Sequence, residues 1–252
     1  MSEIHNHFII GGAPRCGTTW LVRLLERHPQ VYIAKPVFPE PKFFLVDELY
    51  GLGLTYYFET WFRNAPTGSV AGEKSANYLE NSHLPERIYK HLPDVKLIFI
   101  LRDPIERAFS NYLFSRMNGF ETEDFETAIK LEESRKRSLP ANLRYTQPFS
   151  YFSRGLYAKH LVPFFEKFPR NNILCLRLED MVAAPELETR RVHSFLGLTV
   201  GPQDAFGLGV INKADGRDTQ VFPPDVIARL RDAYLNSNSD LTRLLGPRFQ
   251  WG

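Results

Sequence analysis

Residues 8–29 read FIIGGAPRCGTTWLVRLLERHP, and this stretch decides the fold. It opens as a buried apolar strand, passes through a turn that carries Gly12 and Gly17, and continues as a helix over residues 18–28. A strand, a glycine-bearing turn and a helix in this order expose backbone N–H groups at the positive end of the helix dipole. The stretch therefore predicts a phosphate-binding loop.

The loop departs from the nucleotide-kinase pattern G-x-x-x-x-G-K-[ST] at one position, where Thr18 replaces the lysine. That lysine bridges the terminal phosphates of a nucleoside triphosphate, so Arg15 is the cation of the loop left to do equivalent work. An ordinary strand-to-helix turn with a threonine cap is the alternative, because short motifs have many false matches.

Bulk composition bounds the class of protein. The 252 residues are 43% hydrophobic and 24% charged with a formal net charge of +2, which is typical of a globular protein and predicts no nucleic-acid or membrane partner from charge. The longest apolar run, at residues 97–101, is far shorter than the roughly 20 residues of a membrane span. Cys16 and Cys175 form no motif together, so we expect a soluble protein in the reducing cytoplasm, without a signal peptide.

Strand and helix patterns alternate along the chain. Strands are predicted at residues 8–12, 30–34, 69–75, 95–103 and 172–178, and helices at residues 18–28, 55–62, 84–91, 104–117, 130–138, 155–168, 185–196 and 224–236. Residues 36–44 hold three prolines and are predicted as a loop. The alternation predicts an α/β fold in one domain, 1–252, with a P-loop-type parallel sheet flanked by helices on both faces.

The loop resembles a known one. Residues 14–20, PRCGTTW, resemble the 5′-phosphosulfate loop, P-[KR]-x-G-[TS]-[TS], of sulfotransferases that use 3′-phosphoadenosine-5′-phosphosulfate (PAPS). The donor of that family ends in a sulfate rather than a γ-phosphate, which accounts for the missing lysine. The resemblance implies that the nucleotide is bound by Arg15, Cys16, Gly17, Thr18, Thr19 and Trp20.

A second stretch extends the match. Residues 101–112, LRDPIERAFSNY, are similar to the 3′-phosphate motif of the same family, which implies that Arg102 and Ser110 hold the 3′-phosphate. An arginine offers a planar fork of donors, and a hydroxyl on the following helix can face the same oxygens. Taken alone, Arg102 and Asp103 also fit a strand-end ion pair beside a helix cap.

Residues 72–88, GEKSANYLENSHLPERI, are similar to the E-K-[ST]-x-x-Y segment of heparan sulfate N- and 3-O-sulfotransferases. This resemblance implies that Glu73 is the general base and Lys74 a cation beside the transferring sulfuryl group. Arg15 then stabilises the charge that builds on the leaving phosphate oxygen. A surface Glu–Lys pair beside a turn is the alternative.

Three weaker matches remain. Residues 153–169 resemble a family helix and imply that Tyr157 lines the nucleotide pocket, with a core tyrosine as the alternative. Residues 211–220, INKADGRDTQ, stand where the family has a K-G-R loop, although Asp215 alters the spacing. That match implies that phosphate contacts come from Lys213, Gly216 and Arg217. Residues 39–44, PEPKFF, resemble a segment near the acceptor in which lysine replaces a histidine, and acceptor contacts are predicted at Lys42, Phe43 and Asn77.

The resemblance implies an enzyme that moves a sulfuryl group in line from PAPS to an acceptor hydroxyl or amine, without a metal. A sugar acceptor is favoured by the heparan-type segment, and a bacterial small-molecule, lipid or polyketide acceptor stays open. A P-loop small-molecule kinase and a non-catalytic nucleotide-binding module are the rival functions. The missing lysine argues against the kinase, and Glu73 with Lys74 argues against the module.

Overall fold

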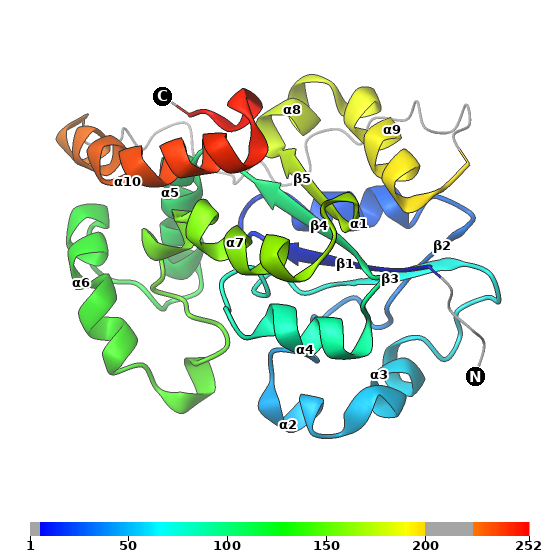
Figure 1. The fold of residues 1–252 in the computed structure, drawn as a ribbon. Helices are drawn as coiled ribbons and strands as arrows, with labels where there is room; N and C mark the ends of the chain where they lie inside the picture. The colour runs from blue at the N-terminus through cyan, green and yellow to red at the C-terminus, as the bar shows by residue number, and fades with distance from the viewer. Residues whose placement is uncertain (1–5, 200–223, 252) are drawn as a thin grey trace. The chain divides into compact units, whose positions relative to one another are not determined.

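The computed structural model describes residues 6–199 and 224–251. The chain divides into two compact units, Met1–Leu101 with Val162–Ile211 and Arg102–Leu161 with Asn212–Gly252. We call them unit 1 and unit 2 and describe each by itself (Figure 1). That the whole chain forms one domain stays a prediction.

Unit 1 is built on a five-stranded sheet in the order β2-β3-β1-β4-β5. Its strands are β1 (Asn6–Gly12), β2 (Val31–Ile33), β3 (Val70–Lys74), β4 (Lys96–Leu101) and β5 (Ile173–Arg177), and every neighbouring pair is parallel. From Phe8 to Gly12 and from Leu97 to Leu101 every residue is buried, as expected for central strands that are covered on both faces. The predicted parallel α/β sheet is confirmed.

Helices cover both faces of this sheet. The helices of unit 1 are α1 (Thr18–Leu25), α2 (Asp47–Tyr50), α3 (Gly53–Trp61), α4 (Leu84–His91), α8 (Leu178–Ala183) and α9 (Pro185–Leu196), with a 3-10 turn at Arg170–Asn172. In Figure 1, α3 and α4 lie on one face, and α1, α8 and α9 lie on the other. The sequence pattern predicted α4 and α9 with the observed bounds, whereas α2 and α8 are too short to show a helical period.

An aromatic cluster fills the space between β3 and α3. Tyr57 is fully buried, and its ring centroid lies 4.8 Å from that of Phe43 and 5.2 Å from that of Phe62. Trp61 is also buried and packs on the same tyrosine. Three of the six aromatic side chains of residues 50–62, those of Tyr57, Trp61 and Phe62, thus belong to the core of unit 1, where they stabilise the fold by burial of apolar area.

Unit 2 is helical in its described residues. It holds α5 (Pro104–Met117), α6 (Phe125–Arg137), the first half of α7 (Tyr157–Lys167), α10 (Pro224–Leu245) and 3-10 turns at Ala141–Leu143, Ser153–Gly155 and Pro247–Phe249. The carboxylate of Asp103 caps α5 by accepting the N–H groups of Ile105 at 2.8 Å and Glu106 at 3.1 Å. The start of α5 is as predicted, because Asp103 and Pro104 form a strong helix start.

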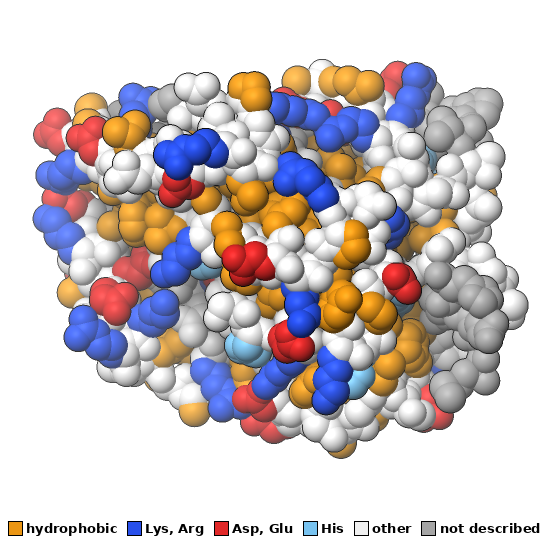
Figure 2. Space-filling view, viewed as in Figure 1, with side chains coloured by type: hydrophobic (Ala, Val, Ile, Leu, Met, Phe, Trp, Pro, Cys, Tyr) orange, Lys and Arg blue, Asp and Glu red, His pale blue; other side chains and the backbone are white. Residues whose placement is uncertain are grey.

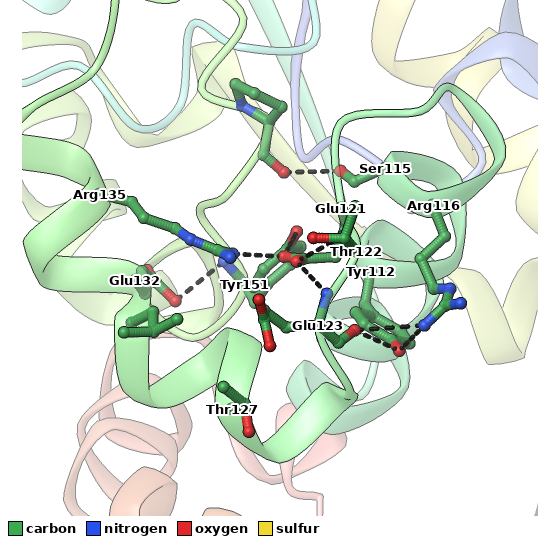
Figure 3. A network of polar contacts seen from close by, with 12 residues as sticks. Tyr112, Ser115, Arg116, Glu121, Thr122, Glu123, Thr127, Glu132, Arg135 and Tyr151 are labelled. Carbon is green, nitrogen blue, oxygen red and sulfur yellow. Dashed lines mark hydrogen bonds and ion pairs between the residues drawn. The ribbon is translucent and has the colours of Figure 1, made fainter.

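Buried carboxylates tie α5, α6 and the following loop together (Figure 3). Glu121 accepts hydrogen bonds from the Tyr151 hydroxyl at 2.7 Å and from Arg135 at 2.5 Å. Burial acts to raise the pKa of Glu121, but these donors outweigh it and hold the pKa below its ordinary value. Glu132 accepts the backbone N–H groups of residues 151, 152 and 153 at 2.9, 2.6 and 2.9 Å.

No helix within the described residues has the length and apolar character that crossing a membrane requires.

Candidate active site

The phosphate-binding loop spans residues 13–17, between the end of β1 and the start of α1. Gly17 takes the N-cap position with φ 89°, a left-handed conformation that favours glycine, and Arg15 also has a positive φ of 68°. No described side chain caps α1, and its first turn holds no acidic residue. The helix therefore presents its positive end, through backbone N–H groups, to an anion.

Close packing fixes the loop from behind. A Cβ atom on Gly12 would lie 2.8 Å from the Cβ of Leu79 and 2.9 Å from the Ala76 carbonyl oxygen, so only glycine fits there. Cys16 is fully buried, with its thiol 3.7 Å from the Pro14 carbonyl oxygen. Thr18 and Trp20, which the sequence predicted as nucleotide contacts, also have buried side chains. Burial of this kind holds the backbone of the loop in one shape.

Lys74 connects the loop to a carboxylate that the sequence did not single out. Its Nζ atom lies 3.3 Å from the Thr19 hydroxyl oxygen and 2.8 Å from a carboxylate oxygen of Glu40. The ring of Phe38 lies over the same ammonium at 4.6 Å. Lys74 is 4% exposed and Glu40 16% exposed, so the pair is well shielded yet the carboxylate can be reached.

Glu73 lies on the other face of the sheet. Its carboxylate is fully buried and accepts the hydroxyls of Ser75 at 2.6 Å, Tyr78 at 3.1 Å and Tyr57 at 3.2 Å. Burial raises the pKa of Glu73 to about 7; the three hydroxyl donors lower it and the nearby charge of Glu40 raises it.

The structure does not support the base role that the sequence indicated for Glu73. Successive residues of a strand point to opposite faces, and the carboxylate of Glu73 and the ammonium of Lys74 contact different partners, Tyr57 and Thr19. A general base must come within about 3 Å of the proton that it removes, and a carboxylate with no exposed surface has no such approach. The segment PEPKFF contains Glu40 two residues before Lys42, so the sequence already places this carboxylate in the motif that resembles an acceptor segment.

The predicted acceptor contacts divide between surface and core. Lys42 is partly exposed, and its backbone N–H donates to the Ser75 hydroxyl at 2.9 Å. Phe43 is 1% exposed and packs on Tyr57, so its predicted acceptor contact is wrong for this structure because the ring faces the core. Asn77 is buried, with its amide donating to Glu80 at 2.9 Å.

The 3′-phosphate motif lies in unit 2. Arg102, with 13% of its side chain exposed, directly follows β4 and pairs with Glu106 at 2.7 Å. Ser110 is buried on α5, one helical turn beyond Glu106. Tyr157 is fully buried and its hydroxyl donates to the Arg102 carbonyl oxygen at 2.9 Å, so it fixes the backbone of the predicted phosphate ligand.

Lys213, Gly216 and Arg217 lie outside the described residues. Within the described residues, no group of three or more His, Cys, Asp or Glu side chains is arranged to hold a metal ion.

Comparisons with known proteins show the family of this chain. A family model described as "Sulfotransferase domain" matches residues 5–206. Mouse heparan sulfate glucosamine 3-O-sulfotransferase 3B1 is 33% identical over 96% of this chain, which covers 64% of that protein's length. Human heparan sulfate glucosamine 3-O-sulfotransferase 6 is 29% identical over 97% of the chain and 73% of its own length.

Solved structures give the same fold. A sulfotransferase from Alicyclobacillus acidocaldarius superposes with a TM-score of 0.79 at 26% identity and 95% coverage of both chains. A mouse sulfotransferase complexed with PAP (3′,5′-diphosphoadenosine), at 19% identity, has a TM-score of 0.51 over 78% of this chain and 60% of its own. By its loop, its sheet and these matches, the chain belongs to the sulfotransferase domain family.

Proposed function

We propose that this chain transfers a sulfuryl group from PAPS to a hydroxyl or amine of a glucosamine-type sugar. The observation that carries the proposal is the contact series in unit 1 from Thr19 through Lys74 to Glu40. It joins an anion-binding helix start to a carboxylate through one ammonium, which is the arrangement that a group transfer from an anionic donor to a protic acceptor requires.

The residues present fit PAPS. The uncapped start of α1 suits a 5′-phosphate, with Thr18 and Thr19 in its first turn and Arg15 in the loop as the cation for the leaving oxygen. Arg102 and Ser110 suit the 3′-phosphate, for which a guanidinium fork is well shaped. As the donor, PAPS would supply an activated sulfuryl group and leave as PAP.

Glu40 is the base that this arrangement favours. Its carboxylate can take the proton from an acceptor hydroxyl, while Lys74, 2.8 Å away, remains beside the oxygens of the transferring group. Glu73 does not compete for this role, because its carboxylate is enclosed by three hydroxyls on the opposite face of the sheet. Its contribution is argued below.

A sugar acceptor is supported by the relatives, which are named as glucosamine 3-O-sulfotransferases. The face of the molecule in Figure 2 carries basic and acidic side chains interspersed with hydrophobic ones. Lys42, in place of the histidine of the family segment, is the cation beside the base that would meet the acceptor.

We further propose that the chain works in the cytoplasm, since both cysteines are free and buried and no disulfide links them. Fractionation of the source cells, with a periplasmic or luminal marker as the contrast, tests this. Recovery with that marker would overturn it.

A direct test of function uses calorimetry followed by transfer. PAP should bind tightly and ATP with magnesium weakly at the same salt concentration, because the loop lacks the lysine of a kinase. Labelled PAPS should then pass its sulfate to glucosamine oligosaccharides. Preference for ATP would support the kinase instead, and PAP binding without transfer to any hydroxyl or amine would support a binding module.

A further inference from the structure

Two short segments of unit 1 are fastened together residue by residue. Residues 40–44 carry the proposed base, and residues 73–78 comprise the last two residues of β3 and the four that follow it. Glu40 accepts from Lys74 and from the Ala76 N–H at 3.2 Å. The N–H of Lys42 donates to Ser75 at 2.9 Å, and that of Phe44 donates to Tyr78 at 3.1 Å.

The hydroxyls of Ser75 and Tyr78 each have a single proton, and both protons are directed to Glu73. Ser75 donates to one carboxylate oxygen at 2.6 Å and Tyr78 to the other at 3.1 Å. A hydroxyl that donates its proton in one direction has its lone pairs in the others. By accepting both protons, the Glu73 carboxylate therefore leaves the hydroxyl oxygens of Ser75 and Tyr78 free to accept the N–H groups of Lys42 and Phe44. The chain of contacts therefore runs from backbone N–H to hydroxyl to carboxylate, twice.

The loop needs this support. Lys42 adopts φ 49°, a left-handed conformation that is unfavourable for a residue with a side chain. Its carbonyl oxygen then accepts the N–H groups of Leu45 at 3.0 Å and Val46 at 2.9 Å, which starts the turn into α2. Because Glu40 is only two residues earlier in the chain, a change in the backbone conformation of Lys42 would also move Glu40.

We propose that Glu73 is a positioning residue, which holds the Glu40 loop in its working place through Ser75 and Tyr78. The proposal rests on the proposed function for the role of Glu40, but the fastening of the loop can be measured without it. Tyr57 provides the matched control. It donates to the same carboxylate at 3.2 Å and bonds His7 at 2.8 Å, without a hydrogen bond to the loop among the described contacts.

Protonation gives a second readout. The groups that face the carboxylate are Tyr57 from α3, Ser75 and Tyr78 from the segment after β3, the charge of Glu40, and His7 of β1 through Tyr57. In a protonated carboxyl group one oxygen carries a proton and donates it. The hydroxyl of either Ser75 or Tyr78 must then turn its own proton away from Glu73. Since the pKa of Glu73 is raised to about 7, the loop should loosen as the pH falls through that value.

The experiment is amide hydrogen exchange at Lys42 and Phe44 in four proteins: wild type, Glu73→Gln, Ser75→Ala and Tyr57→Phe. A carboxamide offers one acceptor and one donor, so Glu73→Gln should speed exchange at one or both amides by about tenfold. Ser75→Ala should speed Lys42 and leave Phe44 unchanged. Tyr57→Phe should leave both unchanged, and unaltered exchange in Glu73→Gln would overturn the proposal.

Kinetics separate positioning from mere stability. With a heparan-type glucosamine oligosaccharide as acceptor, Glu73→Gln should lower kcat about tenfold, because the base Glu40 is less well placed, and should leave the dissociation constant of PAP unchanged; Ser75→Ala should follow it. An equal loss of kcat in Tyr57→Phe would point to general destabilisation and contradict the proposal. If the wild type transfers no sulfate to this acceptor, the proposed function fails, while the exchange result still decides whether Glu73 positions the loop.

Discussion

Glu73 and Lys74 are neighbours in β3, yet one faces Tyr57 beneath α3 and the other faces Thr19 at the start of α1. A strand places successive side chains on opposite faces, so one sequence motif supplies two separate parts of unit 1. In the proposals above, Lys74 belongs to the anion site, and Glu73 supports the loop that carries Glu40. The predictions below separate these roles.

Glu40→Gln should lower kcat by about a hundredfold or more, because it removes the group that accepts the acceptor proton. Affinity for PAP should change by less than about twofold, since the loop around Thr19 is unaltered. Steady-state kinetics and calorimetry measure the two effects. Glu59→Gln, an exposed change on α3, is the control; near-normal turnover in Glu40→Gln would return the base role to another carboxylate.

Lys74→Met should also lower kcat by about a hundredfold, because the ammonium beside Thr19 and Glu40 no longer stabilises the transferring group. The variant should bind PAP nearly as well as wild type but lose part of any preference for PAPS. Competition binding with the two nucleotides checks this. Lys35→Met, which removes a half-exposed partner of Glu26, should change neither quantity.

Arg102→Ala should weaken PAP binding by about ten- to a hundredfold, as expected for loss of a charged hydrogen bond to phosphate. AMP lacks the 3′-phosphate, so its affinity should not change. Titration with both nucleotides distinguishes the two. Equal losses for PAP and AMP would mean that Arg102 acts through the fold, for example through its pair with Glu106. The exposed change Arg231→Ala serves as the control.

The free energy of unfolding should depend on pH through the ionisation of Glu73. Burial raises its pKa from 4.5 to about 7, so the folded protein keeps a proton that the unfolded chain has released in this window. The free energy of unfolding contributed by this group is therefore greatest below about pH 4.5 and is lost as the pH rises to about 7.

Urea denaturation of wild type and Glu73→Gln at several pH values measures this effect. The difference between the two proteins should change by about 1.4 kcal/mol per pH unit within the window. Burial lowers the pKa of His7 to about 3, which acts in the opposite direction, but it does so in both proteins and cancels in the difference. If the difference in the free energy of unfolding did not change with pH, the raised pKa of Glu73 would be contradicted.

Glu132→Ala should reduce the free energy of unfolding by about 2–4 kcal/mol, because three backbone N–H groups at residues 151–153 lose their acceptor. Its neighbour Glu133 is 71% exposed and pairs loosely with Arg137 at 3.8 Å. Glu133→Ala should therefore cost less than about 0.5 kcal/mol. Chemical denaturation of the two variants makes the comparison, and similar losses would show that the Glu132 contacts carry little free energy.

Short sequence patterns predicted the structural features that depend on neighbouring residues alone. The apolar runs gave the central strands, Asp103 and Pro104 gave the start of α5, and the turn at Gly17 gave the anion-binding loop. Helix α10 continues to Leu245, beyond the predicted end at residue 236, because the polar residues 236–240, NSNSD, interrupt the apolar periodicity before Leu241.

The pairing of Glu40 with Lys74 and the hydroxyl partners of Glu73 could not be predicted from the sequence, for a different reason. The contacts of both residues depend on which face of β3 each side chain occupies. They also depend on the packing of residues 40–44 against residues 73–78, which are more than thirty positions away in the sequence. A linear motif records spacing along one segment and contains no information on a second segment. The sequence-based assignment of Phe43 to the acceptor failed similarly, since the ring packs on Tyr57.

The place of β1 in the sheet also governs the order in which unit 1 can assemble. β1 is near the N-terminus, yet its two hydrogen-bonding neighbours are β3 and β4, with Ala13 donating to Ile100 at 2.8 Å. During synthesis this strand, whose centre Phe8–Ile10 is apolar, must wait until β3 and then β4 have left the ribosome. The phosphate-binding loop acquires its shape only after those long-range pairings close, so slow folding and a need for protection from aggregation accompany an early, central strand.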